Sequence, residues 1–275
     1  MGRVIHTLPE GEPVFGVTSL DNHLFILRVK RLNQIEVYDI DSYRLQHYLS
    51  IPECRTVHDM VACGHNRCIY VADTSHILRV ALPDGEVKKL VVKKWPVIDK
   101  SGQLSVTEIT HNVLVTCRGV RKIKEFTTGG KLIREILLPQ DVCLPSHTVQ
   151  LSGRELIVCH GDRDDPLHRV CLIGSDGQVV KSYGGPPGAG SQQMNVPAHM
   201  AVDGNDCVFV SDLGNRRVLL LSPALTYIRE VVSHKPLKWF PYRLSVDVQR
   251  RHLYVAENEL KGGKFTAGRV IIVNV

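Results

Sequence analysis

The chain has 275 residues, of which 43% are hydrophobic and 23% are charged, and its formal net charge at pH 7 is +6. This composition is typical of a folded globular protein and excludes a disordered or fibrous class. The longest apolar runs, residues 218–221 and 271–273, are much shorter than the roughly 20 residues that a membrane-spanning helix needs. The first residues show no basic segment that leads into an apolar stretch, so we expect no secretory signal, no membrane association and a cytoplasmic location.

A short alternating apolar segment recurs six times along the chain. The six copies cover residues 24–27, 69–72, 113–116, 156–159, 208–211 and 253–256. Their third residues fall at positions 26, 71, 115, 158, 210 and 255, which gives spacings of 45, 44, 43, 52 and 45 residues. A period of about 45 residues is typical of the blades of a β-propeller.

Each copy lies among other predicted strands. An apolar strand stands about ten residues earlier, as residues 200–202 do in the fifth unit, and turn residues such as Asp203 and Gly204 fill the gap. A third strand and then a fourth strand follow, as at residues 123–126 and 132–137. Because sustained helical periodicity is nearly absent, the sequence predicts an all-β fold of six four-stranded antiparallel blades, in a single domain that covers residues 1–275.

The two ends of the chain complement each other. The sixth unit stops at Val275 with only its third strand made, and residues 3–8 form an apolar strand that has no partner in the first unit. An N-terminal strand that completes the last blade would remove the exposed sheet edge of an open array. We therefore expect a closed ring, which has no need of a partner chain and which we expect to be monomeric.

The fifth unit contains the most recognisable motif. It reads Tyr183-Gly184-Gly185, then residues 192–197 ending in Pro197, then 200–203, then 208–212, and finally Asn215-Arg216-Arg217-Val218. This series resembles the NHL repeat, in which a glycine-rich segment, a proline before the inner strand, a Val-Ala-Asp-like second strand and an Asn-x-Arg-Val turn recur. Residues 69–73 and 253–257 repeat the second-strand element, and weaker echoes cover the whole chain.

The resemblance implies a domain similar to the C-terminal domain of tripartite-motif proteins, where it binds RNA or protein, and also similar to domains in some enzymes and extracellular sensors. No RING finger, B-box or coiled coil is present in this sequence, so a ubiquitin-ligase role would need a partner or a larger parent chain. Fold analogy does not by itself give a function.

An acidic residue at the end of a second strand can accept hydrogen bonds from a nearby arginine, and Asp212 with Arg217 is the best candidate pair. We expect this pair to fix its blade rather than to contact a ligand.

Basic residues are predicted to gather on one face. In a propeller, the loops between second and third strands share a face with the connections between blades, and we call this the top face. The lysines and arginines that we place there, and that we take as candidate contacts, include Lys30, Arg31, Arg118, Arg121, Lys122, Arg216, Arg217 and Arg243.

Two connections between blades combine lysine and tryptophan. They contain Lys94 with Trp95 and Lys238 with Trp239. Lysine can bind phosphate while an aromatic ring stacks on an unpaired base, so these pairs are the best signal for nucleic acid. The alternative is that each tryptophan wedges between neighbouring blades while its lysine is merely solvated.

We therefore predict a non-catalytic scaffold whose basic top face binds single-stranded RNA or a protein segment, with no cofactor. A domain that binds only proteins is the first alternative.

The second alternative is a metal-dependent propeller enzyme of the lyase or lactonase type. His147 and His199 occupy matching places near the start of inner strands, and His58 matches if one inserted residue is allowed, although Asp59 is also placed to substitute for it. Some NHL-like propellers are zinc lyases whose channel histidines directly follow a proline. Here Ser146 and Ala198 intervene, so strand alternation predicts a different side-chain direction and a polar channel rim.

The chain has eight cysteines, and none of them forms a Cys-x-x-Cys pair. This pattern predicts buried free thiols. A disulfide framework or a zinc cluster is the alternative.

Overall fold

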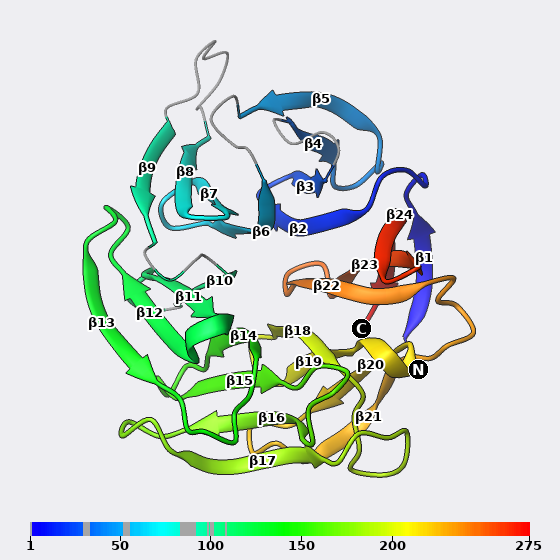
Figure 1. The fold of residues 1–275 in the computed structure, drawn as a ribbon. Coiled ribbons are helices and arrows are strands. Elements are labelled where there is room, and N and C mark those ends of the chain that lie inside the picture. The colour runs from blue at the N-terminus through cyan, green and yellow to red at the C-terminus, as the bar shows by residue number, and fades with distance from the viewer. Residues whose placement is uncertain are drawn as a thin grey trace.

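The computed structural model describes residues 2–29, 34–51, 56–82, 92–97, 99, 102–107 and 109–275. These residues form six four-stranded sheets arranged in a ring (Figure 1), and we call the centre of this ring the channel. All neighbouring strands in the sheets pair antiparallel. Each pair joins strands that follow one another in the sequence, except the pair that joins the two ends of the chain. The predicted all-β propeller of six blades is confirmed.

The blades are numbered in chain order, and each strand is given from the channel outward. Blade 1 is β2 (Val14–Leu20), β3 (His23–Arg28), β4 (Gln34–Asp39) and β5 (Leu45–Ser50). Blade 2 is β6 (Val57–Cys63), β7 (Cys68–Asp73), β8 (His76–Ala81) and β9 (Val92–Pro96). Blade 3 is β10 (Gln103–Val106), β11 (Val113–Cys117), β12 (Lys122–Phe126) and β13 (Leu132–Leu137). Blade 4 is β14 (Pro145–Gln150), β15 (Leu156–His160), β16 (His168–Ile173) and β17 (Val179–Gly185). Blade 5 is β18 (Pro197–Val202), β19 (Val208–Asp212), β20 (Arg217–Leu221) and β21 (Tyr227–Val232). Blade 6 is β22 (Phe240–Asp247), β23 (His252–Lys261), β24 (Lys264–Asn274) and β1 (Arg3–Thr7).

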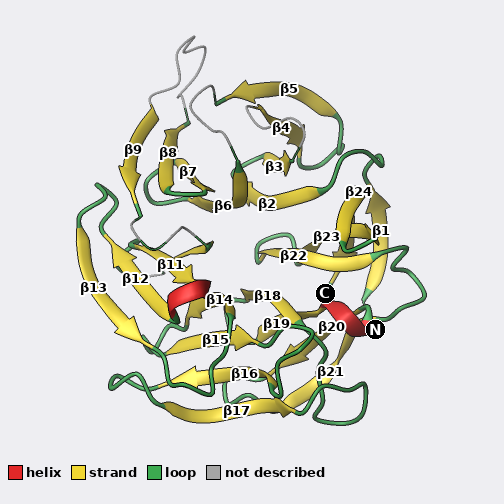
Figure 2. Cartoon of the chain, viewed as in Figure 1, coloured by secondary structure: helices red, strands yellow, loops and turns green. Residues whose placement is uncertain are grey.

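The helical content is two short 3-10 turns, η1 (Arg118–Val120) and η2 (Leu213–Asn215), within the described part of the chain (Figure 2). Both turns join the second and third strands of a blade. No helix among the described residues is long and apolar enough to cross a membrane.

The hydrophobic core is divided among the interfaces between blades. One buried cluster joins Phe25 and Leu27 of blade 1 to Met60, Ile69 and Val71 of blade 2, and five further clusters occupy the other interfaces around the ring. The second strands are covered on both faces, which is why they read as nearly continuous apolar runs in the sequence. The period of the chain therefore reflects one buried strand per blade.

The N-terminal strand closes the ring. β1 pairs antiparallel with β24, with Val4 opposite Val273 and Thr7 opposite Ile271. The Leu8 amide donates to the Val270 carbonyl at 2.8 Å, and the Leu8 side chain is 1% exposed. The predicted closure is confirmed, and the two ends of the chain lie near each other in Figure 1.

The prediction of buried free thiols is met by five of the seven described cysteines, whereas Cys143 and Cys207 are partly exposed. Seven are free thiols, and Cys63, Cys68, Cys117, Cys159 and Cys171 are buried. Cys54 lies outside the described residues.

Candidate functional site at the channel

Polar side chains line the channel near the start of the innermost strands. In blade 4, Pro145 pairs with His160 and His147 pairs with Cys159, so one extra residue, Ser146, bulges out of the ladder. The same register shift in blade 5 leaves Ala198 unpaired and brings His199 opposite Ser211. A bulge of this kind turns the following side chain to the other face of the strand.

This bulge corrects the expectation that the intervening Ser146 and Ala198 would give the histidines a different side-chain direction from that of histidines that directly follow the proline. The His147 and His199 rings are stacked with centroids 3.8 Å apart and an interplanar angle of 16°. Strand alternation predicts side-chain direction only in a regular ladder. The extra residue in each strand reverses the side-chain direction that alternation alone predicts for the two histidines.

The equivalent position is occupied in every blade. Matching the ladders places Gly16, Asp59, Gln103, His147, His199 and Arg243 at this level of blades 1 to 6. We call these six residues the channel ring. The sequence left open whether His58 or Asp59 occupies this position in blade 2. His58 is the bulged residue, so Asp59 occupies it.

Asp59 is the anion of the channel ring and is 1% exposed. Its Oδ1 accepts from Nε of Arg243 at 3.0 Å, and its Oδ2 accepts from the Leu104 amide at 2.8 Å. Burial opposes ionisation of this carboxyl, but the Arg243 guanidinium together with His199 and His147 outweighs burial, and the pKa of Asp59 lies below its usual range. The carboxylate is therefore ionised and satisfied within the protein.

Arg243 crosses the channel from blade 6 to blade 2. Its Nη2 donates to the His58 carbonyl at 2.7 Å, its Nη1 donates to the Tyr242 carbonyl at 3.2 Å, and its Cζ lies 4.0 Å from the centroid of the Tyr242 ring. The sequence placed Arg243 among the contacts on the top face. The structure instead buries it, at 2% exposure, as the partner of Asp59.

Both ring nitrogens of His147 are engaged. Nδ1 accepts from the Met200 amide at 3.3 Å, and Nε2 lies 3.0 Å from the Leu104 carbonyl, to which it can only donate. These partners fix the neutral tautomer that carries its proton on Nε2. His147 is 2% exposed, and burial, followed by the charge of His199, lowers its pKa well below the ordinary value.

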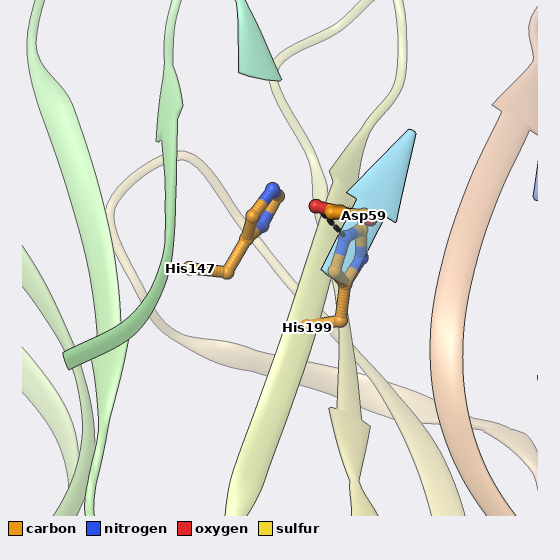
Figure 3. A group of neighbouring side chains, drawn as sticks. All are labelled: Asp59, His147 and His199. Atoms are coloured by element: carbon orange, nitrogen blue, oxygen red, sulfur yellow. Dashed lines mark ion pairs between the residues drawn. The ribbon is translucent and has the colours of Figure 1, made fainter. Parts of the chain in front are cut away.

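His199 has a similar arrangement. Its Nδ1 accepts from the Leu244 amide at 3.3 Å, and its Nε2 faces Oδ2 of Asp59 at 3.8 Å (Figure 3). Burial lowers the pKa of His199, although Asp59 opposes that shift. Asp59, His147 and His199 thus make the same kind of contact. Each side chain accepts a hydrogen bond from an inner-strand amide of the next blade.

Gln103 fills the remaining space. In the amide orientation that satisfies its neighbours, its nitrogen donates to the carbonyls of Ala198 at 3.0 Å and Ser146 at 3.2 Å. Its oxygen then accepts from Arg243 Nη1 at 3.2 Å. The channel ring is therefore a closed hydrogen-bonded network that connects five of the six blades.

Gly16 lets blade 1 approach this network. A Cβ at this buried position would lie 2.7 Å from Cβ of Met60 and 3.3 Å from its amide nitrogen. We expect Gly16→Ala to lower the free energy of unfolding by about 1–3 kcal/mol because two inner strands must separate. Gly119→Ala is the matched control, since nothing lies within 4 Å of the added atom. Equal stability of the two variants in urea unfolding would contradict this packing.

The buried histidines predict a loss of stability in acid. His147 and His199 have lowered pKa values, and burial also lowers the pKa of His160 to about 4. Because the unfolded chain takes up protons below about pH 6.5 while these native side chains do not, each histidine can remove up to about 1.4 kcal/mol of stability per pH unit. We expect urea unfolding to show lower stability at pH 5 than at pH 7, and His147→Gln to show a smaller drop. A flat profile between these two pH values would contradict the neutral state.

Three side chains of the channel ring lie close enough together to share one metal ion. Asp59, His147 and His199 can each offer one ligand atom, and these atoms lie within 4.8 Å of one another. The donor set does not fit a metal ion, because each nitrogen of His147 already bonds to a backbone group and the Asp59 oxygens bond to Arg243 and to Leu104. His58 lies outside this group, and its Nε2 is 3.3 Å from the Thr74 hydroxyl.

A cavity opens beyond the channel ring, on the face opposite the top face. It has a volume of about 460 Å³ and touches all six innermost strands. The residues that line it include the apolar Val17, Met60 and Leu104, and also Ser105, whose buried hydroxyl has no hydrogen-bond partner among the described residues. We call this cavity the vestibule.

The predicted tryptophan contacts are buried. Trp95 is 6% exposed and packs in the cluster between blades 2 and 3, and Trp239 is 9% exposed. Trp95 and Lys94 also lie in the outer strand β9 rather than in a connection between blades. Trp95 therefore follows the alternative in which the tryptophan wedges between neighbouring blades and its lysine, Lys94, stays exposed.

Several predicted cations form ion pairs within the protein. Arg118 pairs with Asp162, Lys122 Nζ lies 2.9 Å from Glu135, and Lys238 Nζ lies 2.6 Å from Glu10 and 4.5 Å from the centroid of the Trp239 ring.

Two more predicted cations bond to backbone carbonyls. Arg216 donates to the carbonyls of Leu237 and Lys238 at 2.7 and 2.9 Å, and Arg121 donates to that of Gln140 at 3.4 Å. Lys30 and Arg31 lie outside the described residues.

The predicted Asp212–Arg217 pair is present. Arg217 Nε lies 2.7 Å from Oδ2 of Asp212, which is fully buried, and Oδ1 of Asp212 accepts from the Asn195 amide at 2.7 Å. Glu257 of blade 6 repeats the pattern, with Arg269 as its partner and the Trp239 amide as its donor. These acids fix the connection that leads into their own blade, which is the structural role expected for them.

The chain resembles several solved propellers. The PQQ-bound aldose sugar dehydrogenase of Streptomyces coelicolor matches with a TM-score of 0.70 and 11% identity, over 99% of this chain and 98% of that chain. Virginiamycin B lyase from Staphylococcus aureus matches with a TM-score of 0.64 and 13% identity, over 97% and 99% of the two chains. The β-propeller domain of Cps50 (Swd1) from Myceliophteria thermophila matches with a TM-score of 0.61 and 11% identity, over the whole of both chains.

These likenesses establish the β-propeller fold. They do not separate a scaffold from an enzyme, because at such low identity they carry the fold alone. No family model matches the sequence, so membership of the NHL-repeat family stays a prediction. No curated protein matches it either.

Proposed function

We propose that this chain is a non-catalytic binding scaffold that holds a protein segment at the vestibule. The observation that supports this most strongly is the saturation of the channel ring. The hydrogen-bonding groups of Asp59, Arg243 and His147 are already bonded to residues of other blades. None of the three is therefore free to move a proton or to hold a metal ion for catalysis.

A protein ligand is favoured over RNA by the state of the cations and the aromatic rings. RNA binding by stacking needs accessible rings beside unpaired positive charge. Trp95 and Trp239 are buried, and Arg118, Lys122 and Lys238 are paired with carboxylates.

The vestibule offers what a peptide side chain needs. Its apolar wall can cover a hydrophobic side chain. Val248 stands at its rim and is 52% exposed.

The test is selection of displayed random peptides on the intact protein, followed by affinity measurement against two matched variants. Val248→Asp places a charge at the rim, whereas Val180→Asp places the same charge on the outer strand β17, where Val180 is 67% exposed. We expect Val248→Asp to weaken the selected peptides roughly tenfold or more and Val180→Asp to leave them unchanged.

Two results would overturn this proposal. The first is equal binding of the peptides to both variants. The second is micromolar binding of random single-stranded RNA with an affinity that falls steeply with salt, which would restore the RNA version. Elemental analysis completes the test, since stoichiometric zinc or calcium in the purified protein would support the metalloenzyme instead.

A further inference from the structure

Two cysteines face each other at the end of the hairpin in blade 2. Cys63 ends β6 and Cys68 begins β7, and they are direct partners in the antiparallel ladder. Directly opposed residues in such a ladder have Cα atoms about 4.5–5.5 Å apart, which lies within the range that a disulfide bond spans. Both residues are free thiols.

The surroundings of Cys63 favour its thiolate. The Asn66 side-chain amide donates to Sγ of Cys63 at 3.2 Å from within the turn of the same hairpin. The neighbouring Cys68 thiol, followed by Asn66 and His111, lowers the pKa of Cys63 to about 5, although burial opposes the shift.

Cys63 has a route to small molecules. It is one of the residues that line the vestibule, as are His65 and His111, whose rings are stacked with centroids 3.9 Å apart. Because Cys63 is only 2% exposed, its sulfur is out of reach of a protein thiol.

Cys68 is suited to a second role. It is fully buried. The neighbouring Cys63 and then burial raise the pKa of Cys68, so it stays a protonated thiol beside the Cys63 sulfur.

We propose that Cys63 and Cys68 form a peroxide-sensitive dithiol, in which a small hydroperoxide oxidises Cys63 and Cys68 then closes a disulfide across the hairpin. The Cys63 thiolate attacks one peroxide oxygen, the O–O bond breaks, and hydroxide leaves. The Cys68 sulfur then displaces the hydroxyl group from the Cys63 sulfenic acid, and that hydroxyl leaves with the Cys68 proton as water. The two thiols lose two electrons, and the peroxide gains them.

This modification site is independent of the proposed function, because it needs only that the vestibule admit hydrogen peroxide. The experiment treats the whole chain with hydrogen peroxide, denatures it in acid, alkylates the remaining thiols and digests it with trypsin without reduction. Arg67 lies between the two cysteines, so cleavage there leaves two peptides that only a disulfide keeps together. We expect this linked pair to be the first oxidation product.

Three variants assign the roles. Cys68→Ser should accumulate a Cys63 sulfenic acid that dimedone traps, and Asn66→Ala should slow the reaction about tenfold because a hydrogen bond to the thiolate is lost. Cys207→Ser, which removes a partly exposed cysteine elsewhere in the chain, should leave the product and its rate unchanged.

The outcomes are distinguishable in the unaltered protein. Oxidation of Cys143 or Cys207 before Cys63 would overturn the proposal, and so would full alkylation of both hairpin thiols after peroxide treatment. Direct conversion of Cys63 to sulfinic acid without a linked peptide would overturn the role given to Cys68.

Discussion

Arg243→Met is expected to lower the free energy of unfolding by about 3–5 kcal/mol, because it leaves the buried carboxylate of Asp59 without its charged partner. Urea unfolding at pH 7 measures this loss. The double variant Asp59→Asn with Arg243→Met should recover part of it, since the uncompensated charge is then gone.

Arg118→Met is the matched control for this prediction. Arg118 also pairs with an aspartate, but both side chains are more than 40% exposed, so its loss should cost less than about 1 kcal/mol. If Arg243→Met costs no more than Arg118→Met, the Asp59–Arg243 pair does not hold the channel ring together.

Deletion of residues 2–8 is expected to be the second large effect. The deletion removes the fully buried Leu8, which is worth about 1.5–3 kcal/mol, together with the hydrogen bonds that β1 makes to β24. The total loss of about 4 kcal/mol or more should lower the melting temperature by at least about 8 °C and expose the edge of β24. Calorimetry measures this change.

A circular permutant separates loss of the strand from loss of its position in the chain. Because Arg3 lies opposite Asn274, residues 2–8 can follow Val275 through a short Asn-Gly turn, with the new chain beginning at Pro9. We expect this permutant to melt within a few degrees of the natural order. If the permutant were as unstable as the deletion, the closing strand would not act through its pairing with β24.

The architecture was predictable because it depends on the number and spacing of the repeated strands. One buried second strand in each blade produces the apolar period, and the missing fourth strand of the last unit identifies residues 3–8 as its complement. Both signals are local, so a single sequence carries them.

The channel ring was only partly predictable. His147 and His199 were identified by their matching positions, but the bulges at Ser146 and Ala198 that aim them are a property of the ladder and leave no local signal. Asp59 and Arg243 are 184 residues apart in the chain, and their pairing depends on which blades meet across the channel. The repeat alignment could have placed Arg243 in the ring if one inserted residue had been allowed in its inner strand.

Several predicted contacts on the top face are not available to a ligand, because their partners also come from distant parts of the chain. Lysines and arginines in loops look free in a sequence, but their partners come from distant segments, as Glu10 does for Lys238 at a separation of 228 residues. Burial of Trp95 and Trp239 likewise depends on the packing between blades. Composition therefore overstated the charge and the aromatic surface available to a ligand.

The measurement that tests the channel ring most directly is a long-range ¹H–¹⁵N correlation spectrum of the histidine side chains, recorded with and without one equivalent of zinc. We predict that His147 and His199 appear as neutral rings protonated on Nε2 at pH 7, and that zinc leaves both sets of signals unchanged. Zinc-dependent shifts at both histidines, or an Nδ1-protonated tautomer at His147, would contradict a ring whose polar groups are satisfied within the protein.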